Sequence, residues 1–326
     1  MRILVIGGTR FVGKHFVAQA LAAGHEITLF HRGRTGSDLF PEAEHRVGDR
    51  DSDLAALAPG RWDATVDTCA YLPRQVHGLA DALDGRGGHH LLVSSTAVYA
   101  TPSGPGIDED APLTELADPT VEEVNADSYG GLKVLCEQAA AARHGDATVL
   151  VRPTYVVGPG DYTWRFPWWV HRIARGGQVA VPGPAGNPAQ LIDARDLGAF
   201  MVHLLEVGAA GGFNAAGPSN TFTWAEQMDA IASAVAPAGT TLHWLTPAAA
   251  AAVVQDAGPG AFPLWGGTGP ERWQETSDPA KAFAAGLTVR PLAGTTRDTL
   301  TWSRTSAPPD GIGLSADAEA ALLAAR

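Results

Sequence analysis

Short apolar runs alternate with helical patterns through the first half of the chain. The runs contain few polar positions, which is typical of strands that are buried on both faces of a sheet. Strands are predicted at residues 3–6, 27–31, 65–67, 90–94 and 148–151, and helices at residues 12–23 and about 126–144. Because strands alternate with helices, the pattern favours an α/β fold, a Rossmann-type parallel sheet that is doubly wound by helices.

The first predicted strand is followed by a glycine turn and the start of a helix. The turn contains Gly7, Gly8 and Gly13, with Thr9, Arg10, Phe11 and Val12 between them. Glycine lets the backbone approach a pyrophosphate closely, and the free N–H groups at a helix N-terminus bind the anion. The turn is therefore predicted to bind a dinucleotide. A turn with only a structural role is the alternative.

The chain is predicted to divide into two interleaved parts. Residues 158–189 are rich in glycine, proline and tryptophan, whereas a helix at 194–207 and a strand at 212–215 indicate a return to the sheet. An alanine-rich helix at 316–325 ends the pattern. We predict a dinucleotide-binding domain at residues 1–157 plus about 190–218, a smaller interleaved C-terminal substrate domain at about 158–189 plus 219–310, and a C-terminal helix at 311–326.

Composition and charge exclude several classes of function. The 326 residues carry 35 acidic and 23 basic side chains, a net charge of −12, which disfavours nucleic acids and anionic membrane surfaces as partners. No apolar run approaches the roughly 20 residues that span a bilayer. Only two cysteines occur, Cys69 and Cys136, so a reducing cytoplasm is expected. No Cys/His/Asp spacing predicts a metal site.

Arginines replace two residues that are usual around such a glycine turn. Arg10 stands where the middle glycine is expected, and the second strand ends in His31 and Arg32 without the acidic residue that binds a ribose 2′-OH. A carboxylate there would repel a 2′-phosphate, whereas a guanidinium group binds one. The sequence therefore predicts NADP(H) as the cofactor. A solvated basic loop is the alternative.

Tyr129 and Lys133 lie four residues apart on one face of a predicted helix. The ammonium group favours the phenolate form, as acid–base catalysis near neutral pH requires. Ser95 follows an apolar strand, so its hydroxyl is expected at the C-terminal edge of the sheet, where it could donate to a substrate carbonyl. These residues predict a catalytic set, with an accidental surface contact between Tyr129 and Lys133 as the alternative.

Several motifs together resemble the extended or atypical short-chain dehydrogenases/reductases, within the broad NAD-dependent epimerase/dehydratase family. The matching segments are residues 7–13, 94–99, 129–133, 152–161 (Arg-Pro-Thr-Tyr-Val-Val-Gly-Pro-Gly-Asp) and 192–197. The resemblance covers most of the chain, to about residue 302. It implies the Rossmann fold, and it implies Ser95, Tyr129 and Lys133 as a catalytic triad.

The resemblance also assigns residues to the cofactor and, less directly, to the substrate. Asp49 and Arg50 are expected beside the adenine, Cys69 and Ala70 beside the riboses, and Pro153 to Val156 beside the nicotinamide. The complete cofactor set is Gly7, Thr9, Arg10, Phe11, Val12, Gly13, His31, Arg32, Asp49, Arg50, Cys69, Ala70, Ser94, Pro153 and Val156. The substrate set is Thr96, Tyr155, Trp164 and Arg165, although the clustered tryptophans could equally form the core of the second domain.

Departures from relatives narrow the expected reaction. Thr96 and Ala97 replace the Asp-Glu pair of sugar-nucleotide dehydratases, and Ala189 and a residue near Trp265 stand where epimerases carry two arginines for a diphosphate. We predict an NADP(H)-dependent oxidoreductase that moves a hydride between nicotinamide and the carbonyl or hydroxyl of a small or ring-bearing substrate. The alternatives are a sugar or nucleotide-sugar epimerase with a retained cofactor, in which Cys69 could be a second acid–base group, and a non-catalytic nucleotide- or RNA-binding regulator.

The regulator alternative comes from a further resemblance to the chloroplast stem-loop RNA-binding proteins of the same family, in the Gly-Thr-Arg-Phe turn and the Arg-Gly after the second strand. The intact catalytic set and the net charge of −12 argue against it. A small-molecule substrate is therefore the expected partner, without nucleic acid or membrane. The assembly state is left open, with a homodimer among the options.

Overall fold

A central parallel sheet organises the first half of the protein. The computed structural model describes residues 1–324, with the side chains of all of these except residues 219–221. The sheet has the strand order β3-β2-β1-β4-β5-β6-β10, all parallel, which confirms the predicted Rossmann-type sheet. Its strands are β1 (Arg2–Ile6), β2 (Glu26–His31), β3 (Glu44–Val47), β4 (Ala64–Asp67), β5 (His89–Val93), β6 (Thr148–Pro153) and β10 (Gly211–Ala215).

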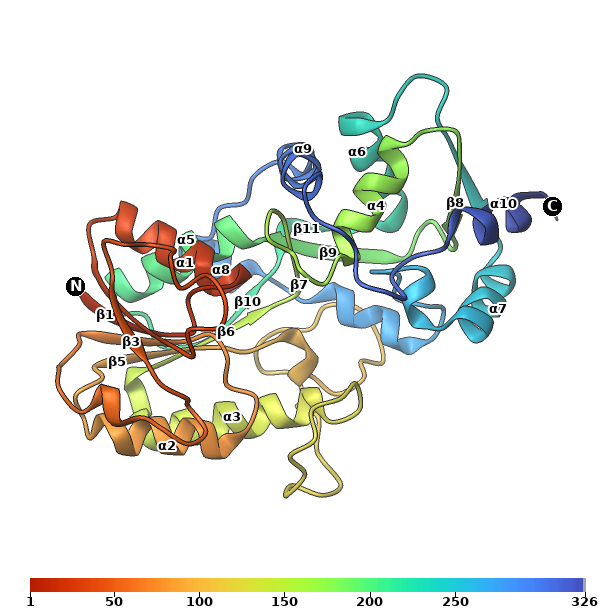
Figure 1. Ribbon diagram of the computed structural model, residues 1–326. Coiled ribbons are helices and arrows are strands. Elements are labelled where there is room, and N and C mark those ends of the chain that lie inside the picture. The colour runs from red at the N-terminus through yellow and green to blue at the C-terminus, as the bar shows by residue number, and fades with distance from the viewer. Residues whose placement is uncertain (325–326) are drawn as a thin grey trace.

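Helices cover both faces of this sheet (Figure 1). On one face lie α1 (Phe11–Ala22) and α5 (Ala194–Glu206), and on the other lie α2 (Pro73–Leu83) and α3 (Tyr129–His144). Strands β2 and β3 are added on one side of β1, and β4, β5 and β6 on the other, so the strand order reverses between β1 and β4. On such sheets, ligands bind in the crevice at the C-terminal ends of the strands at this point. Gly198 lets α1 and α5 pack closely, because an added Cβ would lie 2.9 Å from the backbone carbonyl carbon of His15.

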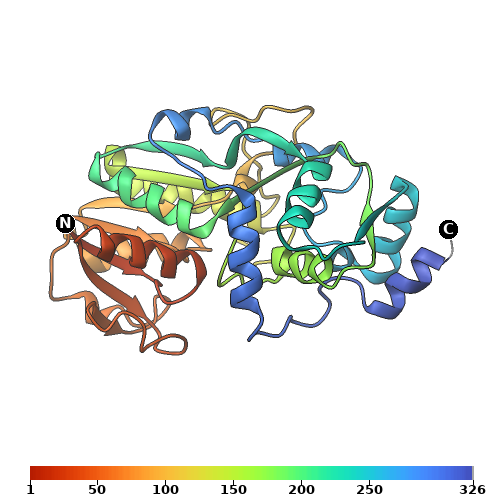
Figure 2. The ribbon, with the colours of Figure 1, turned by 90° about the horizontal axis from the view of Figure 1, so that it is seen from above.

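The second half is built on two small sheets and has its own hydrophobic core (Figure 2). One sheet joins β7 (Tyr155–Val157), β9 (Pro188–Asp193) and β11 (Gly217–Thr223), and the other pairs β8 (Gln178–Pro182) with β12 (Thr241–Leu245). Trp169 and Trp224 are 0% and 2% exposed at the centre of this core, with ring centroids 5.5 Å apart. The helices of this half are α4 (Arg165–Ala174), α6 (Trp224–Val235), α7 (Pro247–Ala257), α9 (Leu292–Ser303) and α10 (Ala316–Ala324), and the short α8 (Ala280–Ala284) lies against β10.

Several element boundaries differ from the sequence-based expectations. Helix α3 begins at Tyr129 and not near residue 126, because Ser128 and Asn125 form a hydrogen-bonded turn before it. The C-terminal helix, predicted at 311–326, begins at Ala316 and extends to Ala324, and residues 325–326 lie outside the described residues. Several elements were not predicted, among them β3, α2 and α4. The division into two domains stays a prediction.

Within the part of the chain that the structure describes, no helix has the length and apolar character to cross a membrane.

Candidate functional site

The Lys133 side chain is buried where the central sheet meets α3. It is 3% exposed, and its Nζ donates hydrogen bonds to the carbonyl oxygens of Ala70 and Val93, at 2.9 and 2.6 Å. Val93 ends β5, and Ala70 follows the end of β4. The ammonium group therefore joins the C-terminal ends of two neighbouring strands to α3, and the two carbonyl oxygens compensate for much of its lost hydration.

Tyr129 is the first residue of α3 and lies one helical turn before Lys133. Its half-buried ring faces Tyr71, and the two ring centroids are 6.4 Å apart. Lys133 Nζ is 5.7 Å from the centre of the Tyr71 ring. Burial, together with the neighbouring Tyr162 and Tyr129, raises the pKa of Tyr71 to about 12, so Tyr71 stays a neutral phenol at neutral pH.

Three hydroxyl residues follow β5 at the same edge of the sheet. Ser95 caps a short 3₁₀ turn, where its Oγ accepts a hydrogen bond of 3.1 Å from the backbone N–H of Ala97. Thr96 Oγ1 donates to the carbonyl oxygen of Pro153 at 3.4 Å. Ser94 is 3% exposed, and its Oγ has no hydrogen-bond partner among the described residues. Ser95 and Thr96 thus lie in the turn that follows β5, and this turn contacts α3, the helix that carries Tyr129 and Lys133.

The turn between β1 and α1 is closely packed and has backbone angles that favour glycine. Gly7 and Gly8 have φ of +99° and +85°, which favours glycine at both positions. An added Cβ on Gly13 would lie 2.8 Å from the backbone nitrogen of Gly8. Arg10 occupies the N-cap of α1 without a side-chain hydrogen bond to the first turn. The N–H groups at this helix end are therefore free to bind an anion.

The loop after β2 carries the basic residues beside this turn. His31 shares a 2.9 Å hydrogen bond with His45 and accepts one from the backbone N–H of Gly33 at 3.0 Å. Arg32 and Arg34 are exposed, and neither forms an ion pair with a described residue. At Gly36 the loop lies against the glycine turn, which is called the phosphate turn below, because an added Cβ there would be 3.0 Å from the carbonyl oxygen of Thr9.

Arg50 lies in a buried ion pair next to the same crevice. Its guanidinium donates to both carboxylate oxygens of Asp67, at 2.7 and 2.8 Å, and to Cys69 Sγ at 3.4 Å. Burial alone would raise the pKa of Asp67, but the Arg50 guanidinium holds it below its usual value. Burial and the Asp67 carboxylate raise the pKa of the Cys69 thiol. Asp49, by contrast, closes a turn through backbone hydrogen bonds with Asp53.

Two of the residues assigned to the substrate, Tyr155 and Arg165, lie near a buried carboxyl group that the sequence did not reveal. Glu275 is 9% exposed and lies 3.2 Å from the hydroxyl of Thr154, which follows Pro153 at the end of β6. Burial raises the pKa of Glu275 to about 8. The neighbouring Glu275 also raises the pKa of Tyr155. The Arg165 guanidinium stacks on the Tyr155 ring at 4.9 Å from its centre.

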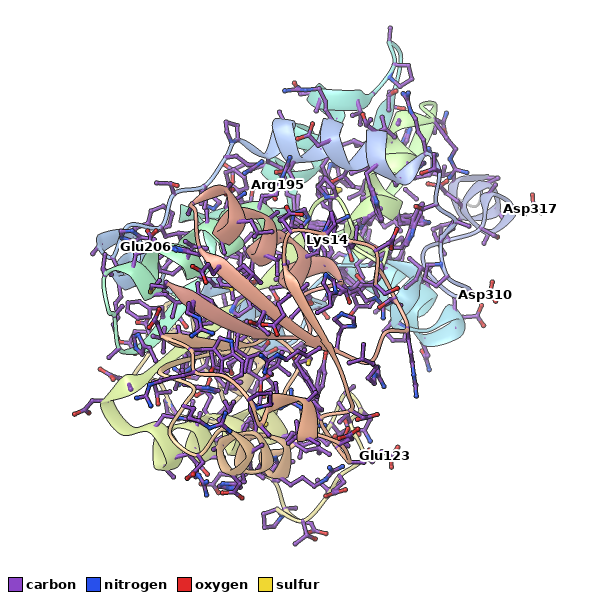
Figure 3. The ribbon with its side chains drawn as sticks, turned by 60° about the vertical axis from the view of Figure 1, so that its left-hand side comes forward. Lys14, Glu123, Arg195, Glu206, Asp310 and Asp317 are labelled. Atoms are coloured by element: carbon purple, nitrogen blue, oxygen red, sulfur yellow. The ribbon has the colours of Figure 1, made fainter. Side chains whose placement is uncertain are left out.

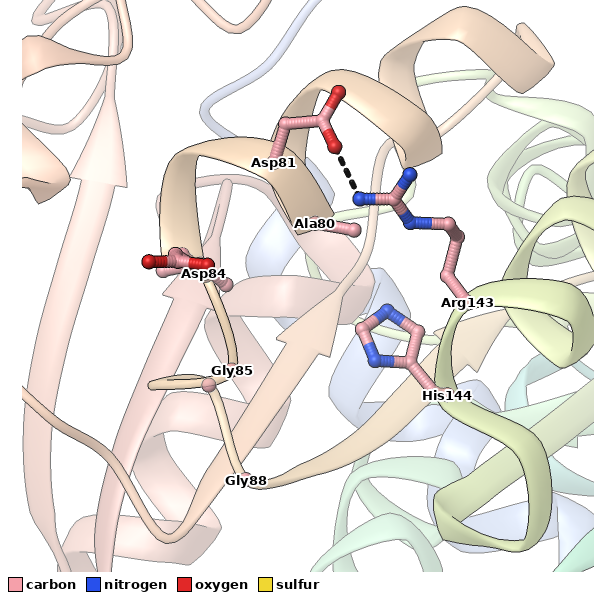
Figure 4. A pocket seen from close by; sticks show the side chains of 9 residues that line it. Ala80, Asp81, Asp84, Gly85, Gly88, Arg143 and His144 are labelled. Atoms are coloured by element: carbon pink, nitrogen blue, oxygen red, sulfur yellow. Dashed lines mark hydrogen bonds and ion pairs between the residues drawn. The ribbon is translucent and has the colours of Figure 1, made fainter.

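Two other residues assigned from the sequence contribute to packing. Trp164 is 5% exposed and packs against the rings of His171 and Trp302, so its indole is part of a packed aromatic cluster. Val156 is half-buried and packs against the main core. A cavity of about 300 Å³ between the C-terminal ends of α2 and α3 is lined by residues such as Asp84, Arg143 and His144, and contains none of the predicted site residues (Figure 4).

The sequence of the chain matches a known family over most of its length. Residues 3–216 match the NAD dependent epimerase/dehydratase family. The epimerase family protein SDR39U1 of Bos taurus is 29% identical over 259 residues, which are 72% of this chain and 81% of that protein. The chloroplast stem-loop binding protein of 41 kDa b from Arabidopsis thaliana is 26% identical over 257 residues, 73% of this chain but only 63% of its own length.

Solved structures show the same fold. Human SDR39U1 with NADPH has a TM-score of 0.64 and 23% identity, covering 94% of this chain and 100% of that one. UDP-glucuronic acid 4-epimerase from Bacillus cereus with NAD has a TM-score of 0.67 and 15% identity, covering 93% of this chain and 99% of that one. Since the family match extends over more than half of the sequence and includes the glycine turn, Ser95, Tyr129 and Lys133, the chain belongs to the NAD dependent epimerase/dehydratase family.

Proposed function

We propose that this protein is an NADP(H)-dependent oxidoreductase that interconverts a carbonyl and a hydroxyl group on a small or ring-bearing substrate. The observation that carries the proposal is the buried Lys133 ammonium, fixed by the carbonyl oxygens of Ala70 and Val93 one helical turn from Tyr129. A buried cation beside a phenol and a serine hydroxyl at a ligand-binding sheet edge suits proton transfer to a substrate oxygen.

Each side chain of this set has a separate role. The Tyr129 phenol gives its proton to the substrate oxygen as that oxygen becomes an alkoxide, and takes the proton back in the reverse direction. The Ser95 hydroxyl donates a hydrogen bond to the same oxygen. Lys133 supplies a fixed positive charge that favours the phenolate left on Tyr129. Tyr71, held as a neutral phenol, lines the approach to Tyr129 without competing for the proton.

The residues at the glycine turn fit a dinucleotide. The close approach of Gly13 to Gly8 and the free N–H groups of α1 form a cradle for a pyrophosphate. The unpaired, buried Ser94 Oγ marks a polar position at the strand edge that a bound ligand would satisfy. When bound, the nicotinamide supplies or accepts the hydride. Gly7, Thr9, Phe11, Val12, Ala70 and Pro153 complete the set that we assign to this cofactor.

NADP(H) is proposed over NAD(H) because the loop after β2 offers unpaired cations. Arg32 and Arg34 are exposed, and Gly36 brings their loop next to Thr9 of the phosphate turn. Guanidinium groups in that place would bind a 2′-phosphate in a fork geometry. Relatives of similar fold are known with each cofactor, NADPH in human SDR39U1 and NAD in the Bacillus cereus epimerase, so the preference needs a direct measurement.

A small-molecule substrate in a reducing cytoplasm is the setting that we propose. Cys69 and Cys136 are free thiols, as a reducing compartment would keep them. Acidic side chains such as Glu123, Asp310 and Asp317 lie around the periphery of the molecule, which disfavours a polyanionic partner (Figure 3).

The test combines cofactor binding with turnover. Nucleotide released from the denatured protein is identified first, and the stripped protein is then titrated with NADPH and NADH. A panel of carbonyl compounds is assayed for NADPH oxidation with the wild type and with Tyr129→Phe. We expect Tyr129→Phe to lower kcat by orders of magnitude and to leave NADPH affinity within about twofold, because the proton donor is lost but the cradle is intact.

Three results would overturn this function. A fully active Tyr129→Phe variant would remove Tyr129 from the chemistry. Stoichiometric NAD released from the purified protein would favour an epimerase that retains its cofactor. If the wild type bound neither nucleotide, only a non-catalytic role on the same scaffold would be left.

A further inference from the structure

A loop from the second half of the protein crosses the start of α1. The loop joins β7 to α4, and the carbonyl oxygen of Pro159 lies 2.7 Å from His15 Nε2 on α1. Gly160 approaches the Phe11 ring, with an added Cβ 3.5 Å from it. The Tyr162 ring stands edge-on to Phe11, at 6.2 Å between centroids. The loop is thus anchored on the helix whose N-terminus forms the phosphate turn.

Tyr162 also stacks on the arginine of that turn. The guanidinium carbon of Arg10 lies 3.5 Å from the centre of the Tyr162 ring. Arg10 is exposed and forms no hydrogen bond or ion pair with another described side chain. A stacked guanidinium uses its flat face, so its N–H groups in the ring plane stay free to bind an anion.

Stacking also fixes a side chain that would otherwise be mobile. A free arginine side chain has a large rotamer entropy, part of which is lost when it binds a phosphate. Tyr162 orders Arg10 before any ligand arrives. Tyr162 is 45% exposed, so its ring can be replaced without opening a buried core.

We propose that Tyr162 is a positioning residue for cofactor binding, whose ring holds the Arg10 guanidinium at the phosphate turn so that it binds a phosphate group of the dinucleotide. The loop between β7 and α4 thereby contributes to cofactor affinity, although it belongs to the half of the chain expected to bind substrate. This inference rests on the proposed function, because it requires that the turn binds a dinucleotide.

The experiment is a double-mutant cycle on nucleotide affinity. NADPH and NADH are titrated against the wild type, Tyr162→Phe, Tyr162→Ala, Arg10→Ala and the double variant Arg10→Ala/Tyr162→Ala, with intrinsic fluorescence as the signal. Tyr162→Ala is expected to weaken NADPH about two- to fivefold, as the loss of an exposed cation–π contact would. Tyr162→Phe keeps the ring and should match the wild type. In the Arg10→Ala background, loss of the ring should have no further effect.

Thermal melting of every variant separates this role from a loss of folding. Tyr162→Ala with wild-type affinity, or with the same loss in the Arg10→Ala background, would overturn the positioning role while leaving the proposed function intact. A wild type that binds neither nucleotide would instead overturn the proposed function, and the inference with it. Equal weakening of NADPH and NADH assigns Arg10 to the pyrophosphate, and selective weakening of NADPH assigns it to the 2′-phosphate.

Discussion

Among single residues, Glu275 is the group of the site that the sequence could not reveal. Its carboxyl contacts Thr154, which is 121 positions away in the chain, and its burial arises only when the segment after α7 packs against β6 and β9. A glutamate within Arg-Trp-Gln-Glu-Thr has no local pattern that distinguishes it from a surface residue. Tyr129 and Lys133 were predictable, by contrast, because helical spacing alone brings them together.

The Glu275 carboxyl makes the stability of the protein depend on pH. Its pKa is raised from 4.5 to about 8 by burial, so the folded state holds a proton that the unfolded chain has already lost. The contribution of this group to the free energy of unfolding is complete below about pH 4.5 and is lost as the pH rises through 8. Glu275→Gln keeps the shape and removes this titration. We expect the Tm difference between Glu275→Gln and the wild type to shift in favour of the variant between about pH 4.5 and 8, where the unfolded chain is ionised at this position and the folded protein is not.

Differential scanning fluorimetry across that pH range measures both proteins side by side. Melting curves that stay parallel at every pH would mean that Glu275 is already ionised in the folded protein. The comparison needs no substrate and is independent of any activity.

At the scale of elements, the turn from β1 to α1 depends on the absence of a Cβ. A Cβ added to Gly13 would lie 2.8 and 2.9 Å from the backbone nitrogen and Cα of Gly8, and backbone cannot move aside as a flexible side chain would. Gly13→Ala is therefore expected to lower Tm and to weaken nucleotide binding strongly. Gly78 gives a matched control on α2, where the nearest atom to an added Cβ is a Leu54 methyl at 3.9 Å. Gly78→Ala should be neutral or stabilising by up to about 1 kcal/mol, because alanine is the better helix former.

Melting curves and NADPH titrations of the two glycine variants decide this prediction. Equal tolerance of alanine at both positions would contradict the close packing of the turn, and with it the cradle.

Sequence patterns predicted those elements whose apolar positions are also buried in the folded protein. Strand β1 and the start of α1 were predictable because the apolar run and the glycine turn both mark the boundary. Strand β3 was missed because it pairs only with β2 at the sheet edge, and its residues Glu44, His45 and Arg46 are polar and incompletely buried. Helix α4 was missed because it lies in a stretch rich in glycine, proline and tryptophan and contains Pro167, a composition that indicates a loop although its apolar positions have a helical period.

The next prediction concerns the loop after β2 and the choice between NADPH and NADH. Arg32 is exposed and unpaired, and a fork-shaped contact with a 2′-phosphate would be lost in Arg32→Ala. NADPH affinity is expected to fall about tenfold or more, while NADH affinity stays within about twofold. Arg61→Ala removes another exposed arginine, in the segment before β4, and serves as the control. Fluorescence titration with both nucleotides measures the ratio, and an equal loss for NADPH and NADH would contradict a role at the 2′-phosphate.

At the scale of the whole molecule, the central sheet and the second core are connected through the end of β6. The chain passes from Pro153 in β6 into β7 of a small sheet, and a buried ion pair between Arg152 and Glu137, at 2.7 Å, ties that strand to α3. The same strand end therefore contacts Thr96, which donates a hydrogen bond to Pro153, and leads into the other half. Tyr155 is only two residues beyond Pro153 in the chain. A substrate that contacts Tyr155 would therefore lie close to the turn that carries Thr96.

The net charge of the molecule gives the last prediction, which concerns RNA. A relative in Arabidopsis thaliana is a chloroplast stem-loop binding protein, and the exposed arginines beside the phosphate turn form a small basic area. Binding to a polyanion depends on many phosphate contacts and weakens steeply with salt. Here the few arginines act against a net charge of −12, so any RNA binding should be weak and should vanish between about 50 and 200 mM salt.

Filter binding with a labelled stem-loop RNA measures this, and NADPH binding measured at the same salt concentrations serves as the reference. Saturable RNA binding at about 200 mM salt that NADPH displaces would show that the turn takes RNA, and would favour the regulator over the oxidoreductase.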